Sequence, residues 1–92
     1  MALTAGGFTT YDYNRMVVKF TMMNDETEIA CAISTDAMDQ LEGSSRTTPE
    51  QRENQFLRLR DRIEARAARK FDASELEGTP PGVILRGIDF RN

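Results

Sequence analysis

Four arginines at helical spacing are the residues of this sequence most suited to recognising another molecule. Arg58, Arg62, Arg66 and Arg69 follow one another at intervals of four, four and three residues. On a helix, this spacing places the side chains within about 80° of one another, as one line of positive charge. The planar guanidinium group pairs with carboxylates and phosphates. We name these four residues the arginine ridge and predict that they form a protein-binding surface.

A second interpretation of the arginine ridge stays open, in which it is a solvated helix face partly neutralised by acids from elsewhere in the fold. Within the helix, Asp61 can pair with Arg58, and Glu64 can pair with Arg60. Neither Arg62 nor Arg66 has an acid three or four residues further on. Because like charges four residues apart are mildly destabilising, a helix selected for stability alone would interleave acids.

The charge of the rest of the chain decides which partner the arginine ridge favours. Residues 49–71 carry seven cations and four acids, a net charge of +3, whereas the remainder carries five cations and eleven acids, a net charge of −6. The acidic remainder would repel a nucleic acid, so we expect an acidic protein surface or a second copy of this chain. The alternative is a nucleic-acid-associated accessory factor that binds phosphates through the same face.

Several classes of enzyme are disfavoured by the residues that could do chemistry. The chain has no histidine, which is the commonest general base and zinc ligand, and one cysteine, Cys31, on the apolar side of a predicted strand. Asp36, Asp39 and Glu42 could offer oxygen ligands to a cation, but their spacing favours a solvated acidic face. We therefore predict a protein that is not an enzyme, without catalytic residues, cofactor or metal site.

The arginine ridge lies on the clearest predicted element, a long helix over residues 49–72. Thr48 is a suitable N-cap, Pro49 suits the first helical position, and Gln51 completes a capping box. An apolar stripe on a different side of the helix must pack on a core. It consists of Phe56, Leu59, Ile63, Ala67 and Phe71.

The elements before and after this helix predict the sheet on which it packs. Apolar residues alternate over residues 15–23 and 28–33, with a polar turn between them, which indicates a β-hairpin. Residues 8–13 allow a leading edge strand, and Ser34 or Thr35 can cap a short helix that stops at Gly43. A loop over residues 43–47 precedes the long helix. A second loop, over residues 78–82, precedes a final strand over residues 83–90. We predict one α+β domain over residues 1–92. Its antiparallel sheet of three to four strands has the long helix on one face. An open sheet edge would also allow a homodimer.

Composition and hydropathy agree with a globular protein. The net charge is −3, and 39% of the residues are hydrophobic. The first residues lack the basic start and apolar run of a signal peptide, and no apolar stretch has the length of a membrane span. We therefore expect a cytoplasmic protein with no membrane partner.

Spaced positions along nearly the whole chain form a pattern that can be compared with known families. They are residues 17–20 (Val-Val-Lys-Phe), 31–34 (Cys-Ala-Ile-Ser) and 36–38 (Asp-Ala-Met), Phe56, Arg60, Ile63 and Ala67 in the helix, and Ile84, Leu85, Asp89 and Phe90. At these positions the chain resembles the domain-of-unknown-function 1488 family, which consists of short bacterial proteins. The resemblance implies a bacterial α+β domain, and it carries no activity or functional residues with it.

Overall fold

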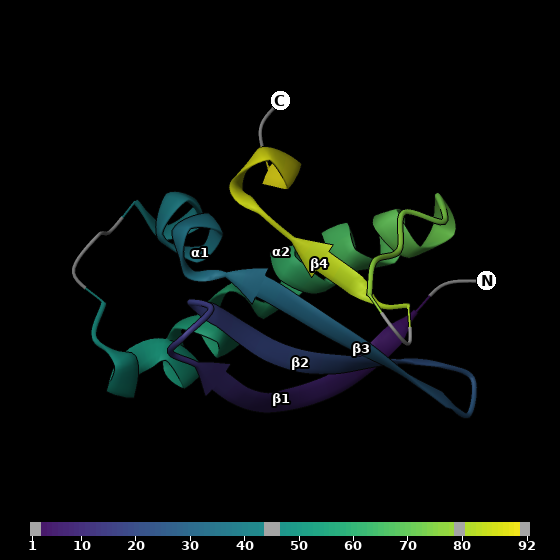
Figure 1. Cartoon of the computed structure of the whole chain (residues 1–92), viewed down its shortest axis with the longest axis horizontal. Helices are drawn as coiled ribbons and strands as arrows, with labels where there is room; N and C mark the ends of the chain where they lie inside the picture. The colour runs from purple at the N-terminus through teal and green to yellow at the C-terminus, as the bar shows by residue number, and fades with distance from the viewer. Residues whose placement is uncertain (1–2, 44–46, 79–80, 91–92) are drawn as a thin grey trace.

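The computed structural model of the chain describes residues 3–43, 47–78 and 81–90 (Figure 1). Parts of the predicted loops over 43–47 and 78–82 lie outside these ranges. The elements in chain order are β1 (Thr4–Asp12), β2 (Val17–Asn24), β3 (Thr27–Ser34), α1 (Thr35–Glu42), the 3₁₀ turn η1 (Pro49–Gln51), α2 (Arg52–Asp72), β4 (Val83–Leu85) and the 3₁₀ turn η2 (Gly87–Phe90). None of the helices in these ranges combines the length and the hydropathy that a membrane span needs.

The first three strands form an antiparallel meander, which confirms the predicted hairpin. Asp25, in the turn between β2 and β3, adopts a left-handed φ of 56°. The leading strand runs from Thr4 to Asp12 and is longer than the sequence predicts. At its end, the Asp12 carboxylate accepts hydrogen bonds from the backbone N–H groups of Asn14 and Arg15, at 3.0 and 3.2 Å, and turns the chain into β2.

The cap predicted for the first helix forms at Ser34, and the capping box predicted for the second forms at the 3₁₀ turn that precedes it. Ser34 Oγ accepts a hydrogen bond from the Ala37 N–H at 3.1 Å, and Gly43 ends α1 in a left-handed conformation. Before α2, the Gln51 side chain accepts a hydrogen bond from the Thr48 N–H at 3.0 Å. The first turn, from Pro49 to Gln51, is 3₁₀, so the α-helix itself begins at Arg52.

The last strand differs from the expectation in direction and in length. The sheet has the order β1-β2-β3-β4, and β4 pairs parallel with β3, so the sheet is mixed where the sequence predicted an antiparallel one. A helix of 21 residues returns the chain along the sheet once, so β4 starts from the same end as β3. The predicted strand over 83–90 ends at Leu85, because the Asp89 carboxylate accepts a hydrogen bond from the Arg86 N–H at 2.7 Å and closes η2.

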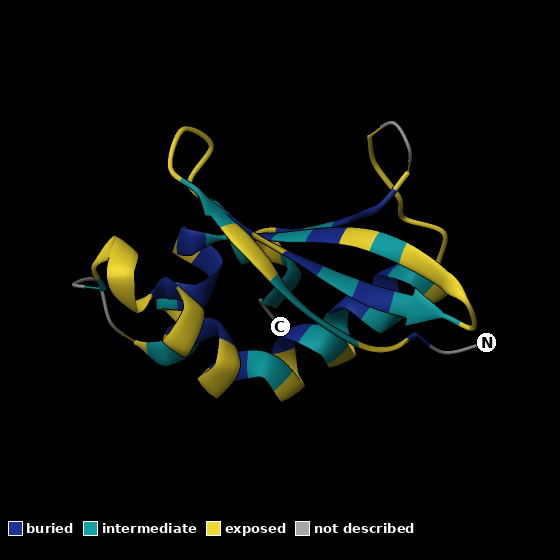
Figure 2. Cartoon of the chain, turned by 90° about the horizontal axis from the view of Figure 1, so that it is seen from below, coloured by how far each residue is buried: buried dark blue, intermediate teal, exposed yellow. Residues whose placement is uncertain are grey.

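The long helix covers one face of the sheet, which confirms the predicted α+β fold class (Figure 2). Phe56 packs at the centre, with ring centroids 5.0 Å from Phe20 and 6.1 Å from Phe8. The stripe is buried except at its end, where Phe71 is half-buried. The buried core consists of Leu3, Val18, Phe20, Met22, Cys31, Ile33, Ala37, Met38, Phe56, Leu59, Ile63, Ala67, Val83 and Leu85. The opposite face of the sheet has no helix over it among the described residues.

Candidate functional site

The arginine ridge runs along the side of α2 that meets α1 and η2. At the α1 end, Arg58 forms a two-pronged ion pair with Glu42, with Nε–Oε2 and Nη2–Oε1 distances of 2.8 and 3.1 Å. These hydrogen bonds hold the pKa of the Glu42 carboxyl below its usual value and raise the pKa of Arg58. The Arg58 side chain stays 55% exposed, so the pair contributes little to stability.

Arg66 is held by the C-terminal turn. Its Nε donates to the backbone carbonyl of Asp89 at 2.7 Å, and its Nη2 lies 3.6 Å from Asp89 Oδ1. The fold therefore supplies an acid to this arginine from a segment 23 residues away. This pairing agrees with the interpretation of the ridge as a face partly neutralised by acids from elsewhere.

The other two ridge residues have no acidic partner among the described residues. Arg62 is exposed and makes one hydrogen bond, at 3.4 Å, to the backbone carbonyl of Leu41. Arg69 is exposed further along the helix. Two members of the ridge thus pair with acids, two have no acidic partner in the described part of the chain, and the role of the ridge in binding stays a prediction.

Of the pairs expected within the helix, one forms. Arg60 Nε lies 2.8 Å from Glu64 Oε2, as predicted. Asp61 makes no ion pair with Arg58 in the described structure, because Glu42 takes that position.

A buried polar network between α1 and the start of α2 was not predicted from the sequence. Arg52 and Gln55 are both buried. Arg52 Nη1 donates to Asp39 Oδ1 at 2.8 Å and also to the Gln55 side-chain oxygen. Gln55 Nε2 in turn donates to Asp39 Oδ1 and Glu42 Oε1, at 3.1 and 3.2 Å. This network joins the two helices beside the Arg58–Glu42 pair.

A second buried cation lies at the other end of α2. Lys70 Nζ donates to the Ile84 carbonyl at 2.8 Å and lies 3.2 Å from Asp89 Oδ1. The Lys70 and Asp89 side chains are 9% and 10% exposed, so the pair is nearly desolvated. Lys70 therefore ties β4 and η2 to the helix.

One signal in the sequence could have revealed both buried cations. At about 100° per residue, Arg52 and Lys70 each fall about 40° from Phe56, inside the arc of the apolar stripe. A cation inside such an arc must be buried or must reach past the core edge to a partner. The partners themselves, Asp39 and Asp89, are 13 and 19 residues away and leave no local pattern.

The acidic residues considered as cation ligands are used in other ways. Asp39 binds Arg52, and Glu42 binds Arg58. Within the described ranges, no three acidic, cysteine or histidine side chains come together as metal ligands. Asp36 lies exposed on α1.

Cys31 is buried on the helix-covered face of β3. Its Sγ lies 3.6 Å from the Ile29 carbonyl oxygen. Burial raises the pKa of its thiol from 9.0 to about 11. A nucleophilic cysteine needs a lowered pKa and access to solvent, so this environment is that of a packed, unreactive side chain.

We expect the Cys31 thiol to react slowly with a thiol-specific reagent at pH 8. A pKa of about 11 leaves the folded protein with about 100-fold less thiolate than a thiol of pKa 9.0, and burial slows the reaction further. The measurement compares the labelling rate of the native protein with that of the protein in denaturant. Equal rates would contradict the buried environment.

The raised pKa also fixes the sign of a pH effect. Because the Cys31 thiol holds its proton more tightly in the folded protein than in the unfolded chain, the protonated thiol adds to the free energy of unfolding. This contribution is present below about pH 9 and is lost as the pH rises to about 11.

A mixed four-stranded sheet with one long helix on one face defines a small α+β protein, and comparison with known proteins agrees with this class. A family model described as "Protein of unknown function (DUF1488)" matches residues 7–80, and the chain belongs to this family. The crystal structure of a protein of unknown function from the DUF1488 family of Shewanella loihica PV-4 has a similar fold. The two sequences are 21% identical, and the match covers 90% of this chain and 94% of the Shewanella chain, with a TM-score of 0.74. No curated protein matches the chain.

Proposed function

We propose that the protein is a non-catalytic, cytoplasmic interaction module that binds an acidic surface of another protein through Arg62 and Arg69. The supporting observation is that both arginines are exposed and neither has an acidic partner among the described residues. They are seven residues apart on α2, so they lie on the same side of the helix and about 10 Å apart along its axis. Two guanidinium groups at this separation suit carboxylates displayed along a helix or strand.

The ion pairs inside the fold favour an acidic protein over a nucleic acid as the partner of the ridge. Arg58 and Arg66 pair with Glu42 and Asp89, which leaves few free cations on the ridge for phosphates. Affinity for nucleic acid depends on the number of phosphates neutralised, and the net charge of −3 opposes such binding.

A second copy of the chain also fits the proposal as partner. The turn between β2 and β3 presents an exposed acidic tip, which the ridge of another molecule could bind. Pairing of β1 edges is less favoured, because two bulges interrupt the register of that strand with β2.

The proposal is tested with the double variant Arg62→Gln/Arg69→Gln. These two residues are chosen because changing Arg58 or Arg66 would also break ion pairs with Glu42 and Asp89. We expect the variant to lose the acidic proteins that the unchanged chain captures from a bacterial lysate. Its free energy of unfolding should stay within about 0.5 kcal/mol, since both side chains are exposed. Captured proteins are identified by mass spectrometry, and sedimentation measures self-association.

The control variant Thr9→Glu/Asn54→Glu lowers the net charge by the same amount at exposed positions away from Arg62 and Arg69. It should capture partners like the unchanged chain. Capture that is equal in the ridge variant and the unchanged chain would overturn the proposal. Capture dominated by nucleic acid, with steep weakening as salt rises, would favour the phosphate-binding alternative.

A further inference from the structure

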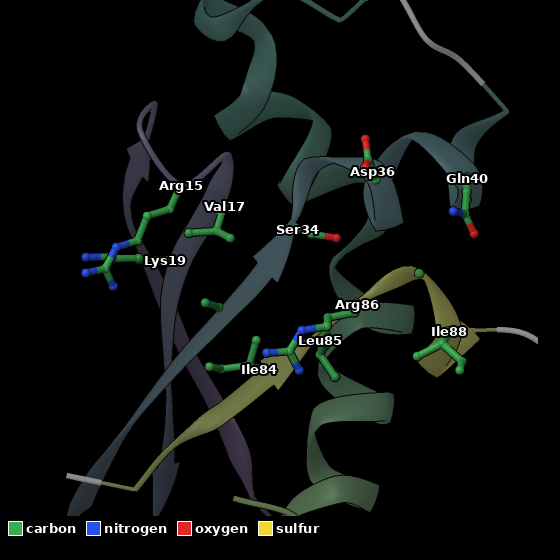
Figure 3. Close-up of a pocket in the computed structure, with 12 residues that line it drawn as sticks. Arg15, Val17, Lys19, Ser34, Asp36, Gln40, Ile84, Leu85, Arg86 and Ile88 are labelled. Atoms are coloured by element: carbon green, nitrogen blue, oxygen red, sulfur yellow. The ribbon is translucent and has the colours of Figure 1, made fainter. Parts of the chain in front are cut away.

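A groove crosses the open face of the sheet, opposite α2. It consists of two adjoining hollows of about 630 and about 320 Å³, which share Arg15, Lys19, Ala32 and Ile84 and so form one continuous depression. Figure 3 shows Arg15, Val17 and Lys19 on the β2 side of the larger hollow and Ile84 and Arg86 on the β4 side. The described lining of the two hollows includes none of the ridge arginines and neither of the buried cations Arg52 and Lys70.

The groove follows from the alternation of side chains along the strands. Val18, Phe20, Cys31 and Ile33 point to the covered face, so their neighbours in β2 and β3 face the open side. On that side β3 contributes small residues such as Ala32, while Lys19 and Ile84 stand higher on the flanking strands. The floor along Ala30–Ser34 is about 13 Å long, which is the length of four to five extended residues.

The groove offers apolar surface that the fold does not use. Ile88 on η2 lines the larger hollow and is 70% exposed. Val17 and Ile84 are half-buried on its two sides. Because an isoleucine gains nothing by facing water, an apolar side chain of an occupant would find contacts here.

The charge of the groove is opposite to that of the whole chain. Of the described residues, three cations and one acid line the larger hollow, although the net charge of the chain is −3. Arg15 has no ion-pair partner among the described residues, and Lys19 has one at 3.7 Å, from Asp12. Arg86 is bound by both oxygens of Glu77, at 2.8 and 3.0 Å, so Arg15 and Lys19 are the cations that an occupant can engage.

We propose that this groove binds an extended peptide segment of a partner protein that carries carboxylate side chains next to an apolar one. The carboxylates would lie at Arg15 and Lys19, and the apolar side chain would lie between Ile84 and Ile88. A single-stranded nucleic acid fits less well, because the described residues that line the two hollows include no aromatic side chain to stack on a base. This surface lies on the face of the sheet opposite α2, so it is independent of the function proposed for Arg62 and Arg69.

A phage-displayed library of random decapeptides, selected on the full-length chain, tests the proposal. Enriched peptides should combine acidic and apolar residues, and they should be synthesised with a fluorophore for affinity measurement by anisotropy. The variant Arg15→Gln/Lys19→Gln removes the two cations that an occupant can engage, and Ala32→Phe fills the floor of the groove. Each is expected to weaken peptide binding by about tenfold or more.

The variant Thr9→Glu/Asn54→Glu again serves as the control, because it lowers the net charge as much as Arg15→Gln/Lys19→Gln does but touches neither hollow. It should bind the peptides within about twofold of the unchanged chain. Circular dichroism of each variant confirms that the fold is retained. Failure to enrich acidic and apolar peptides, or equal affinity for the unchanged chain and both groove variants, would overturn the proposal.

Discussion

Replacing Phe56 with alanine is expected to lower the free energy of unfolding by about 4 kcal/mol. Phe56 is fully buried, and its ring contacts Phe20 on β2 and Phe8 on β1. Alanine would leave a cavity at the point where the long helix meets the sheet, and the aromatic contacts would be lost as well. Urea unfolding followed by circular dichroism measures the change.

The neighbouring residue provides the matched control for this prediction. Leu57 is on the same helix and is 46% exposed, so Leu57→Ala should change stability by no more than about 0.5 kcal/mol. Similar losses for the two variants would mean that α2 does not pack on the sheet through the face that carries Phe56.

The parts of the fold that the sequence predicts correctly depend on residues close together in the chain. The stripe around Phe56 repeats at the helical period, the strands flanking Asp25 alternate, and Thr48 and Gln51 form their cap within three residues. Each of these patterns is complete within one element. The hairpin, both helices and the packing of α2 could therefore be predicted.

The parts that were not predicted depend on distant segments. The direction of β4 is fixed by the single return of the chain along α2, and the hydropathy of Val83–Leu85 contains no information about it. The strand ends early because the Asp89 carboxylate accepts a hydrogen bond from the Arg86 N–H. In the sequence, Asp89 looks like any other polar residue, so this bond could not be predicted. Hydropathy indicates which residues form a strand, whereas the path of the chain through the fold determines which strand they pair with and in which direction.

The arginine ridge shows the same limit for the candidate site. Spacing alone places Arg58, Arg62, Arg66 and Arg69 on one side of the helix. Whether each is free depends on Glu42 and Asp89, which the fold brings from α1 and η2. The groove on the open face could not be predicted in this way, because its walls come from strands and turns far apart in the chain.

The C-terminal segment connects stability to the groove. Lys70 and Arg66 bind Asp89, and the segment from β4 to η2 supplies Ile84, Arg86 and Ile88 to one wall of the groove. The ion pairs on the helix side of this segment therefore position the residues that face the open side.

Replacing Asp89 with asparagine is expected to lower the free energy of unfolding by about 3 kcal/mol. Asparagine keeps the size of the side chain and its acceptor for the Arg86 N–H, but it removes the negative charge beside Lys70 and Arg66. Lys70 would then be a nearly buried cation whose one anionic partner among the described residues is gone. Urea unfolding measures the loss, and Asp72→Asn, at an exposed position on the helix that carries Lys70, should have almost no effect.

The double variant Asp89→Asn/Lys70→Met separates the burial of an unpaired charge from other effects of the substitution. Methionine is apolar and similar in length to lysine, so the pair of changes removes both charges from the buried site. Since a neutral pair leaves no uncompensated charge, the double variant should regain at least about half of the stability lost by Asp89→Asn. A double variant less stable than Asp89→Asn would show that the lysine's hydrogen bond to Ile84, and not its pairing with Asp89, is what holds β4 to the helix.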